Sequence, residues 1–295
     1  MAPKGSEYRG WLGAEVRQDL AAKDFVRELD PCGFVNDAAI ATLGTPTYFG
    51  RDQGFDECLL IFRPAVGPNQ LSRIKVTTEF RGSSSPKVDL GGTSVGVKAE
   101  GGYCIADVPF RNRVISFWTD SLNGSDTCSE AKKFVTAALP QFRTTPLRSE
   151  SKIALNNTPL ARMDPCAALS IVGKNRPRLK VQTGVVPYYC GFMLDSDDQS
   201  TAQNLTSTQK TLDMVEYAVK KNETMQVGSA RARISSSKPA YCSLDLYLDE
   251  KSPRVTTYNS GDPERWVDVV EMSGQTTCEE LAKTATAIVE LYNSQ

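Results

Sequence analysis

The chain has 295 residues, of which 40% are hydrophobic and 23% are charged, and its 34 basic residues nearly balance its 35 acidic ones. It contains no histidine, which excludes Ser-His-Asp and Cys-His nucleophile systems and zinc sites with imidazole ligands. The balanced charge argues against a nucleic-acid partner, because such proteins carry a strong basic excess. The length suggests two domains.

Residues 1–22 form a mixed polar segment ahead of the first structured region. They include Trp11 and a stretch from Ala14 to Leu20 with helical character, but no apolar run long enough for a signal peptide or a membrane span. We interpret them as an N-terminal extension or a juxtamembrane segment. We expect membrane contact only through an anchor that is absent from this chain.

Residues 23–145 are predicted to form a domain that begins with a short helix and ends with a longer one. Asp30-Pro31-Cys32 offers a helix cap followed by proline at the first helical position. Thr127 and Glu130 have capping-box spacing and precede an apolar pattern of helical period. Between them, short β-type runs predict strands at 57–63, 73–80, 93–100, 102–108 and 113–119.

Residues 146–160 are polar and proline-flanked, and they are interpreted as a linker to a second domain at 161–295. Thr277 and Glu280 again have capping-box spacing before a helical pattern. The run from Thr211 to Lys220 is ambiguous, and we favour a helix. Strands are predicted at 178–183, 188–194, 241–248, 254–258 and 266–271.

The two domains share motifs around their cysteines. Asp30-Pro31-Cys32 recurs as Asp164-Pro165-Cys166, Tyr103-Cys104 as Tyr241-Cys242, and Thr127-Cys128 as Thr277-Cys278. We interpret the chain as two tandem copies of one domain. Short connections between strands favour antiparallel pairing. The predicted class is therefore α+β, with a helix, an antiparallel sheet and a C-terminal helix in each copy.

The eight cysteines are widely spaced, which excludes the close pairs of zinc ribbons and thioredoxin-type redox sites. An even, dispersed set is typical of structural disulfides formed in an oxidising compartment. Four cysteines in each copy allow three connectivities, and we favour bonds between chain neighbours because neighbouring elements usually pack together. The favoured pairs are Cys32–Cys58, Cys104–Cys128, Cys166–Cys190 and Cys242–Cys278.

Leu29-Asp30-Pro31-Cys32 and Met163-Asp164-Pro165-Cys166 resemble a motif of actinobacterial exported proteins. Members carry L-D-P-C near the start of the mature domain, a second cysteine some 25 residues later and a terminal helix capped by a cysteine. The group includes envelope lipoproteins and is similar to the disulfide-bonded extracellular sensor domains of mycobacterial membrane Ser/Thr kinases. The resemblance implies an extracytoplasmic, membrane-tethered domain and supplies no catalytic residues. The chain departs from the group in being tandem and in lacking a visible anchor.

Carboxylates are the acid–base groups that remain in the absence of histidine. Asp120 with Asp126, or Asp195, Asp197 and Asp198, are candidates for a hydrolase pair or a calcium cluster. The latter group lacks the glycine and the closing glutamate of a calcium loop, so a solvated loop is favoured. Adjacent Ser237 and Lys238 are a weak candidate for a catalytic dyad, since proline follows them.

Two small basic clusters, Arg176–Lys180 and Arg231–Arg233, are candidates for contact with anionic glycans or lipid headgroups, although a solvated face is favoured for both. Five aromatic residues are candidates for lining a ligand groove, but we expect most of them to lie in the hydrophobic core. They are Phe117, Trp118, Tyr188, Tyr189 and Trp266.

These observations predict a non-enzymatic extracytoplasmic module that binds an envelope ligand, namely a glycan, a lipid or a peptide, or an envelope protein. It is expected to be the ectodomain of a sensor or a lipoprotein, with no cofactor and no metal. The alternatives are a carboxylate-dependent envelope glycan hydrolase and a structural scaffold or chaperone of an envelope complex. No binding residues are identified from the sequence.

Overall fold

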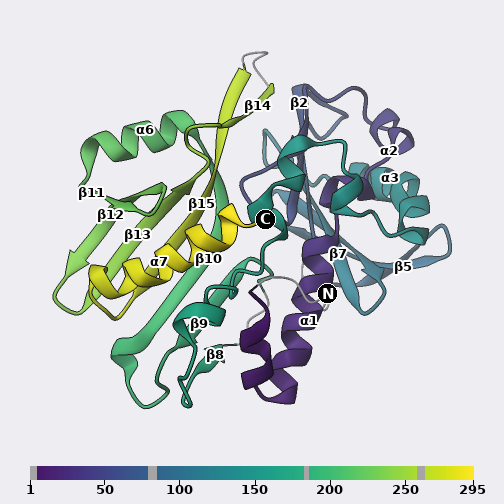
Figure 1. Ribbon diagram of the computed structural model, residues 1–295. Coiled ribbons are helices and arrows are strands. Elements are labelled where there is room, and N and C mark those ends of the chain that lie inside the picture. Colours follow the sequence, from purple (N-terminus) through teal and green to yellow (C-terminus); the bar gives the residue numbers. More distant parts are fainter. Residues whose placement is uncertain (1–4, 79–84, 183–185, 258–262) are drawn as a thin grey trace. The chain divides into compact units, whose positions relative to one another are not determined.

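The computed structural model describes residues 5–78, 85–182, 186–257 and 263–295 (Figure 1). The chain divides into two compact units. The first unit contains residues 28–157. The second unit combines the N-terminal residues up to Arg27 with Thr158–Thr256 and Pro263–Gln295. The boundary thus lies near the end of the expected linker, and the N-terminal segment belongs to the same unit as the C-terminal half.

The first unit is built on an antiparallel sheet that has seven strands among the described residues. The strand order is β1-β2-β3-β7-β6-β5-β4. These strands are β1 (Tyr48–Arg51), β2 (Glu57–Val66), β3 (Leu71–Thr77), β4 (Lys87–Leu90), β5 (Thr93–Glu100), β6 (Tyr103–Phe110) and β7 (Arg113–Ser121). Its α-helices are α2 (Asp37–Ala41) and α3 (Cys128–Ala138), and its 3-10 helices are η2 (Pro31–Phe34), η3 (Leu139–Arg143), η4 (Arg148–Glu150) and η5 (Ala154–Asn157).

The second unit is built on an antiparallel sheet of eight strands within the described ranges, in the order β11-β12-β13-β15-β10-β9-β8, with β14 paired to β15. These strands are β8 (Lys180–Gln182), β9 (Tyr189–Met193), β10 (Ala202–Thr211), β11 (Thr224–Val227), β12 (Ala230–Lys238), β13 (Tyr241–Leu248), β14 (Arg254–Thr257) and β15 (Pro263–Gly274). Its helices are α1 (Ala14–Glu28), α4 (Pro159–Arg162), α5 (Leu169–Val172), α6 (Leu212–Lys221) and α7 (Cys278–Asn293), together with η1 (Glu7–Trp11) and η6 (Gln199–Thr201).

The α+β class and the antiparallel sheets are confirmed. All eight cysteines lie in the described residues and form four disulfides with the predicted pairing. The third and fourth cysteines of each half connect a strand to the first residue of the terminal helix, β6 to α3 and β13 to α7. Each of these bonds fixes the terminal helix on one face of its sheet.

The two sheets have corresponding strand orders. In each sheet, the strand that precedes the terminal helix is central. In the first unit β7 pairs with β6 and β3, and in the second unit β15 pairs with β13 and β10. The turns that follow β6 and β13 each contain a residue of positive φ, Arg111 at 55° and Asp249 at 58°. The second unit carries α6 between β10 and β11 and β14 before β15.

The predicted strands are found, although their ends differ by a few residues. Residues 79–80, 183 and 258, at the ends of three predicted strands, lie outside the described part of the chain. The helix favoured from Thr211 to Lys220 is confirmed as α6. The sequence missed five strands, which are β1, β4, β10, β11 and β12.

The predicted caps are only partly right. Asp30 and Asp164 each accept a hydrogen bond from the backbone N–H of the cysteine two residues later, at 2.9 and 3.0 Å. The Thr277 hydroxyl accepts from Glu280 N–H at 3.3 Å. The capping box at Thr127 is wrong, because its hydroxyl donates to the Thr119 carbonyl at 3.0 Å instead of capping α3.

The segment expected to be a linker, 146–160, packs closely in its described part. Arg148 is buried and donates to the carbonyl oxygens of Leu29, Phe55 and Asn156. Its guanidinium thereby satisfies backbone acceptors that would be costly to bury unpaired. Within the described residues, no helix is both long and apolar enough to cross a bilayer.

Candidate functional site

The carboxylates singled out in the sequence are occupied by other contacts. Asp120 pairs with Arg73, and Asp126 accepts from the Cys128 N–H at 2.8 Å. Asp195 and Asp197 both pair with Arg178, at 2.5 and 2.7 Å. Asp198 caps the short helix η6. None of these carboxylates lines either of the two pockets described below.

The other sequence candidates are also explained by local structure. Ser237 and Lys238 are exposed at the end of β12. The basic cluster at Arg231 and Arg233 is neutralised, since these residues pair with Glu250 and Asp245. Of the aromatic candidates, those in the core are Phe117, Tyr188 and Trp266, and those half-buried are Trp118 and Tyr189.

One group of possible metal ligands occurs among the described residues, formed by Cys104, Asp126 and Cys128. The two sulfur atoms are bonded to each other. They therefore offer no thiolate, which is the form of cysteine that binds metal ions.

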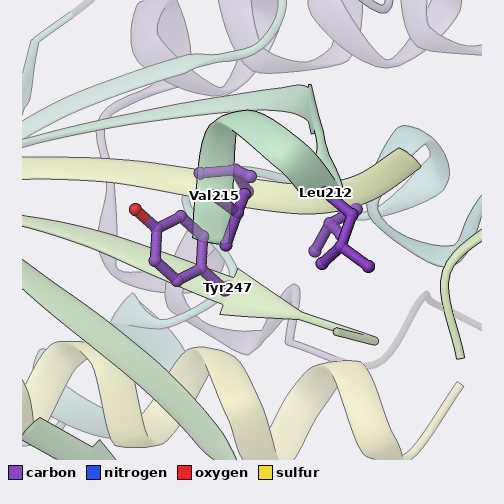
Figure 2. Close-up of a cluster of buried hydrophobic side chains, with 5 residues drawn as sticks. Leu212, Val215 and Tyr247 are labelled. Carbon is purple, nitrogen blue, oxygen red and sulfur yellow. The ribbon is translucent and has the colours of Figure 1, made fainter. Parts of the chain in front are cut away.

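A better candidate site lies beside α6. The helix begins where the Thr211 hydroxyl accepts from Met214 N–H at 3.4 Å, with Asp213 in the first turn and two lysines in the last. Leu212, Val215 and Val219 recur at helical spacing and pack against Tyr247 and the valines of β15 (Figure 2). α6 is thus held on the sheet by an apolar seam.

The alternation of β13 places its side chains on two faces of the sheet. Cys242 forms a disulfide with Cys278 of α7. Tyr247 lies an odd number of residues later, so its side chain points to the other face, where it packs against α6. The two helices therefore lie on opposite faces. Asp245 shares the α6 face with Tyr247, and Arg233 lies directly across from Asp245 on β12.

A pocket of about 580 Å³ and another of about 450 Å³ border this seam. We call the smaller one the α6 pocket; its lining residues are Lys210, Asp213, Met214, Tyr217, Ala218, Arg233, Asp245 and Tyr247. The larger one, the strand-end pocket, includes Leu212, Glu216, Arg231, Tyr247, Asp249, Glu250 and Tyr292. Tyr247 lines both pockets.

The floor of the α6 pocket is an ion network. Arg233 Nη2 and Lys210 Nζ both donate to Asp245 Oδ2, at 2.6 and 3.1 Å. Lys210 also lies 2.7 Å from Glu271 Oε1. The four side chains carry two positive and two negative charges, so the network is neutral overall.

Two polar atoms of the pocket lining are buried without a hydrogen-bond partner, the Tyr247 hydroxyl and Arg233 Nε. The Tyr247 side chain is 1% exposed, and its hydroxyl points away from Leu212 (Figure 2). Burial, and then the nearby charge of Asp245, raises the pKa of Tyr247 to about 12. The hydroxyl therefore stays protonated near neutral pH and can donate a hydrogen bond.

The outer wall of the α6 pocket is apolar and exposed. Met214 and Tyr217, three residues apart on α6, are 54% and 63% exposed. Large apolar side chains at such exposure, next to an unpartnered buried donor, distinguish this surface from an ordinary solvated helix.

Sequence reasoning predicted α6 and β13 but did not single out Tyr247, Asp245 or Lys210. The available signal was the alternation in β13, where leucines occupy one face and Asp245 and Tyr247 the other. That this second face receives α6 depends on contacts that the sequence pattern does not show.

No family model matches the chain, and comparisons with curated proteins and with solved structures find no match.

Proposed function

We propose that this protein is a non-enzymatic, extracytoplasmic binding module of a cell-envelope protein, a sensor ectodomain or a lipoprotein that is membrane-tethered in its full-length form. Its ligand is an envelope glycan, lipid or peptide, or an envelope protein, and the α6 pocket is the binding site. The observation that carries the proposal is that two residues of the pocket lining hold buried polar atoms without a partner, the Tyr247 hydroxyl and Arg233 Nε. Such a hydroxyl costs free energy in the free protein and gains a partner when a ligand binds.

The proposed location is supported by the four disulfides, which persist in oxidising compartments. The resemblance of the Leu29–Cys32 and Met163–Cys166 motifs to actinobacterial exported proteins supports it further. We also propose that the two halves are tandem copies of one domain, on the basis of their shared motifs, disulfide positions and strand order. α6 is then an addition of the second copy that creates the pocket.

The hydrolase alternative has less support in the pocket. Its two carboxylates are paired, Asp245 with Arg233 and Lys210, and Asp213 with Arg265. A glycosidase needs one protonated and one ionised carboxylate facing its substrate. No observation favours the scaffold alternative over the binding module.

The proposal is tested by blocking the pocket in the full chain. Ala218→Trp adds a bulky ring to the pocket lining, and Lys220→Trp adds the same ring at an exposed α6 position outside the lining. The probes are neutral polysaccharides, anionic phospholipid vesicles and synthetic peptides, measured by biolayer interferometry.

We expect one probe class to bind the unmodified protein and Lys220→Trp, and to bind Ala218→Trp at least ten-fold more weakly. Circular dichroism checks that both variants fold. Binding that is unchanged in Ala218→Trp contradicts the assigned site, and conversion of a probe into product supports the hydrolase alternative instead.

A further inference from the structure

We propose that the ligand of the α6 pocket is an uncharged saccharide, bound through neighbouring hydroxyl groups and stacked on Tyr217. This inference rests on the proposed function, because it assigns a ligand class to the same site. Three features of the pocket support it: the charge balance of its floor, its unused hydrogen-bonding atoms and its exposed aromatic wall.

The charge balance favours a neutral ligand. The cations Lys210 and Arg233 are matched by Asp245 and Glu271. At the rim, Asp213 pairs with Arg265 at 3.3 Å. A ligand with net charge would bring an unmatched charge against this partly buried network, and it would lose hydration without gaining a counter-charge.

The unused polar atoms match a hydroxyl-bearing ligand. Tyr247 offers an O–H donor, and Arg233 Nε offers a second donor. Both cations bind the same oxygen of Asp245, Oδ2, and no hydrogen bond to its Oδ1 is found in the described residues. The pocket thus combines donors with an acceptor. A hydroxyl group both donates and accepts, so adjacent hydroxyls of a sugar ring complement this arrangement.

The spacing of these groups suits one ring. Asp245 and Tyr247 are two residues apart on one strand face, which separates their Cα atoms by about 7 Å. Arg233 is the cross-strand partner of Asp245, at the close side-chain spacing of such pairs. The volume, about 450 Å³, lies within the range of small-ligand sites.

The wall supplies the apolar contact that a sugar ring requires. Tyr217 is 63% exposed; Lys221 covers one face of its ring, 4.3 Å from the centroid, and donates to its hydroxyl, so a sugar would stack on the ring face that Lys221 does not cover. The electron-rich face of an aromatic ring attracts the weakly positive C–H groups of a pyranose as well as a cation. Met214 extends this surface by one helical turn.

The test uses the full chain and defined sugars. Methyl glycosides of glucose, galactose, mannose, arabinose and N-acetylglucosamine are screened by saturation-transfer NMR and titrated, with glucuronate and glucosamine as charged analogues. The variants are Tyr247→Phe and Tyr217→Ala. Tyr241→Phe, which alters a tyrosine on the same face of β13 but outside the pocket lining, is the matched control.

We expect at least one neutral sugar to bind and its charged analogues to bind at least ten-fold more weakly. Tyr247→Phe and Tyr217→Ala should each weaken binding about ten-fold, whereas Tyr241→Phe should not. Because the Tyr247 hydroxyl has no partner in the free protein, Tyr247→Phe should not lower the thermal midpoint. A merely structural tyrosine would not separate binding from stability in this way.

Preferential binding of glucuronate or glucosamine in the α6 pocket would overturn the inference and leave the proposed function standing. The same conclusion follows if no sugar binds but vesicles or peptides do, and if Ala218→Trp abolishes that binding. Sugar binding that Tyr247→Phe, Tyr217→Ala and Ala218→Trp all leave unchanged would overturn both the inference and the assigned site.

Discussion

At the scale of single residues, Asp164 has a larger role than its motif predicts. Its side chain caps Cys166, and it also accepts from the Tyr8 hydroxyl at 2.7 Å and pairs with Arg9 and Arg27. Burial alone would raise the pKa of Asp164, but Arg27 and Arg9 outweigh burial and hold the pKa below its usual value. The N-terminal residues are therefore tied to the second unit by a buried ion network.

We expect Asp164→Asn to lower the free energy of unfolding by about 3 kcal/mol, because it removes one of the two carboxylates, Asp24 and Asp164, that neutralise Arg9 and Arg27, while it retains an oxygen for the cap. Since the folded pKa is lowered, the stabilisation is present above the unfolded pKa and is lost as pH falls through the folded pKa. Urea denaturation from pH 2 to 7 measures both effects.

Asp195→Asn is the matched control, because its partner Arg178 is 57% exposed. Its cost is expected to stay below about 1 kcal/mol. Equal losses for the two variants at pH 7 would show that the network around Asp164 does not act as a buried ion cluster.

At the scale of elements, local pattern identified the longer helices, but it missed the short helices α2, α4 and α5 as well as five strands. α7 follows from a capping box and an apolar stripe of helical period, whereas the pattern of α6 was ambiguous and a helix was only favoured there. β10 was missed because the inward-facing residues of its alternating pattern include Gln203, Ser207 and Gln209. Gln203 accepts from Thr284 at 2.7 Å and Gln209 donates to Asp268 at 2.5 Å. Burial of paired polar groups leaves no hydrophobic alternation to detect.

The packing of α6 against the sheet leads to a prediction about stability. Val215→Ala removes two buried methyl groups from the contact with Tyr247, and we expect a loss of about 1–3 kcal/mol in stability. Hydrogen exchange of the α6 amides should rise relative to those of α7. Met214→Ala, at an exposed position on the same helix, should change stability by less than about 0.5 kcal/mol. Equal effects of the two variants would contradict the packing of α6 through Val215.

At the scale of the whole molecule, the disulfides are the main non-local constraint that the sequence revealed. The bonds join cysteines 26, 24, 24 and 36 residues apart, each within one half of the chain. The repeated motifs divided the cysteines into two sets of four, and the observed pairing was favoured among three connectivities in each set because neighbouring elements usually pack together. Cross-links between halves are absent among these eight cysteines.

We expect reduction and alkylation to label all eight cysteines, and a non-reducing peptide map to contain only the four pairs of the structure. Joint replacement of Cys166 and Cys190 by serine should cost about 3–4 kcal/mol, since the bond closes a loop of 24 residues. The Cys32 and Cys58 double variant, with a separation of 26, should cost about the same. A peptide that links the two halves would contradict the connectivity.

The sequence by itself predicted the α+β class and the terminal helices α3 and α7, and it favoured α6 and the observed disulfide pairing among open alternatives, because caps, periodicity and cysteine spacing act over short stretches of chain. Only the tertiary structure decided which face of the sheet α6 covers and hence that Tyr247 is buried without a partner. It also decided that Thr127 bonds Thr119 and that Asp164 binds Tyr8, which is 156 residues away. The physical reason is that a side chain's burial and partners depend on contacts between distant segments, which local periodicity does not record.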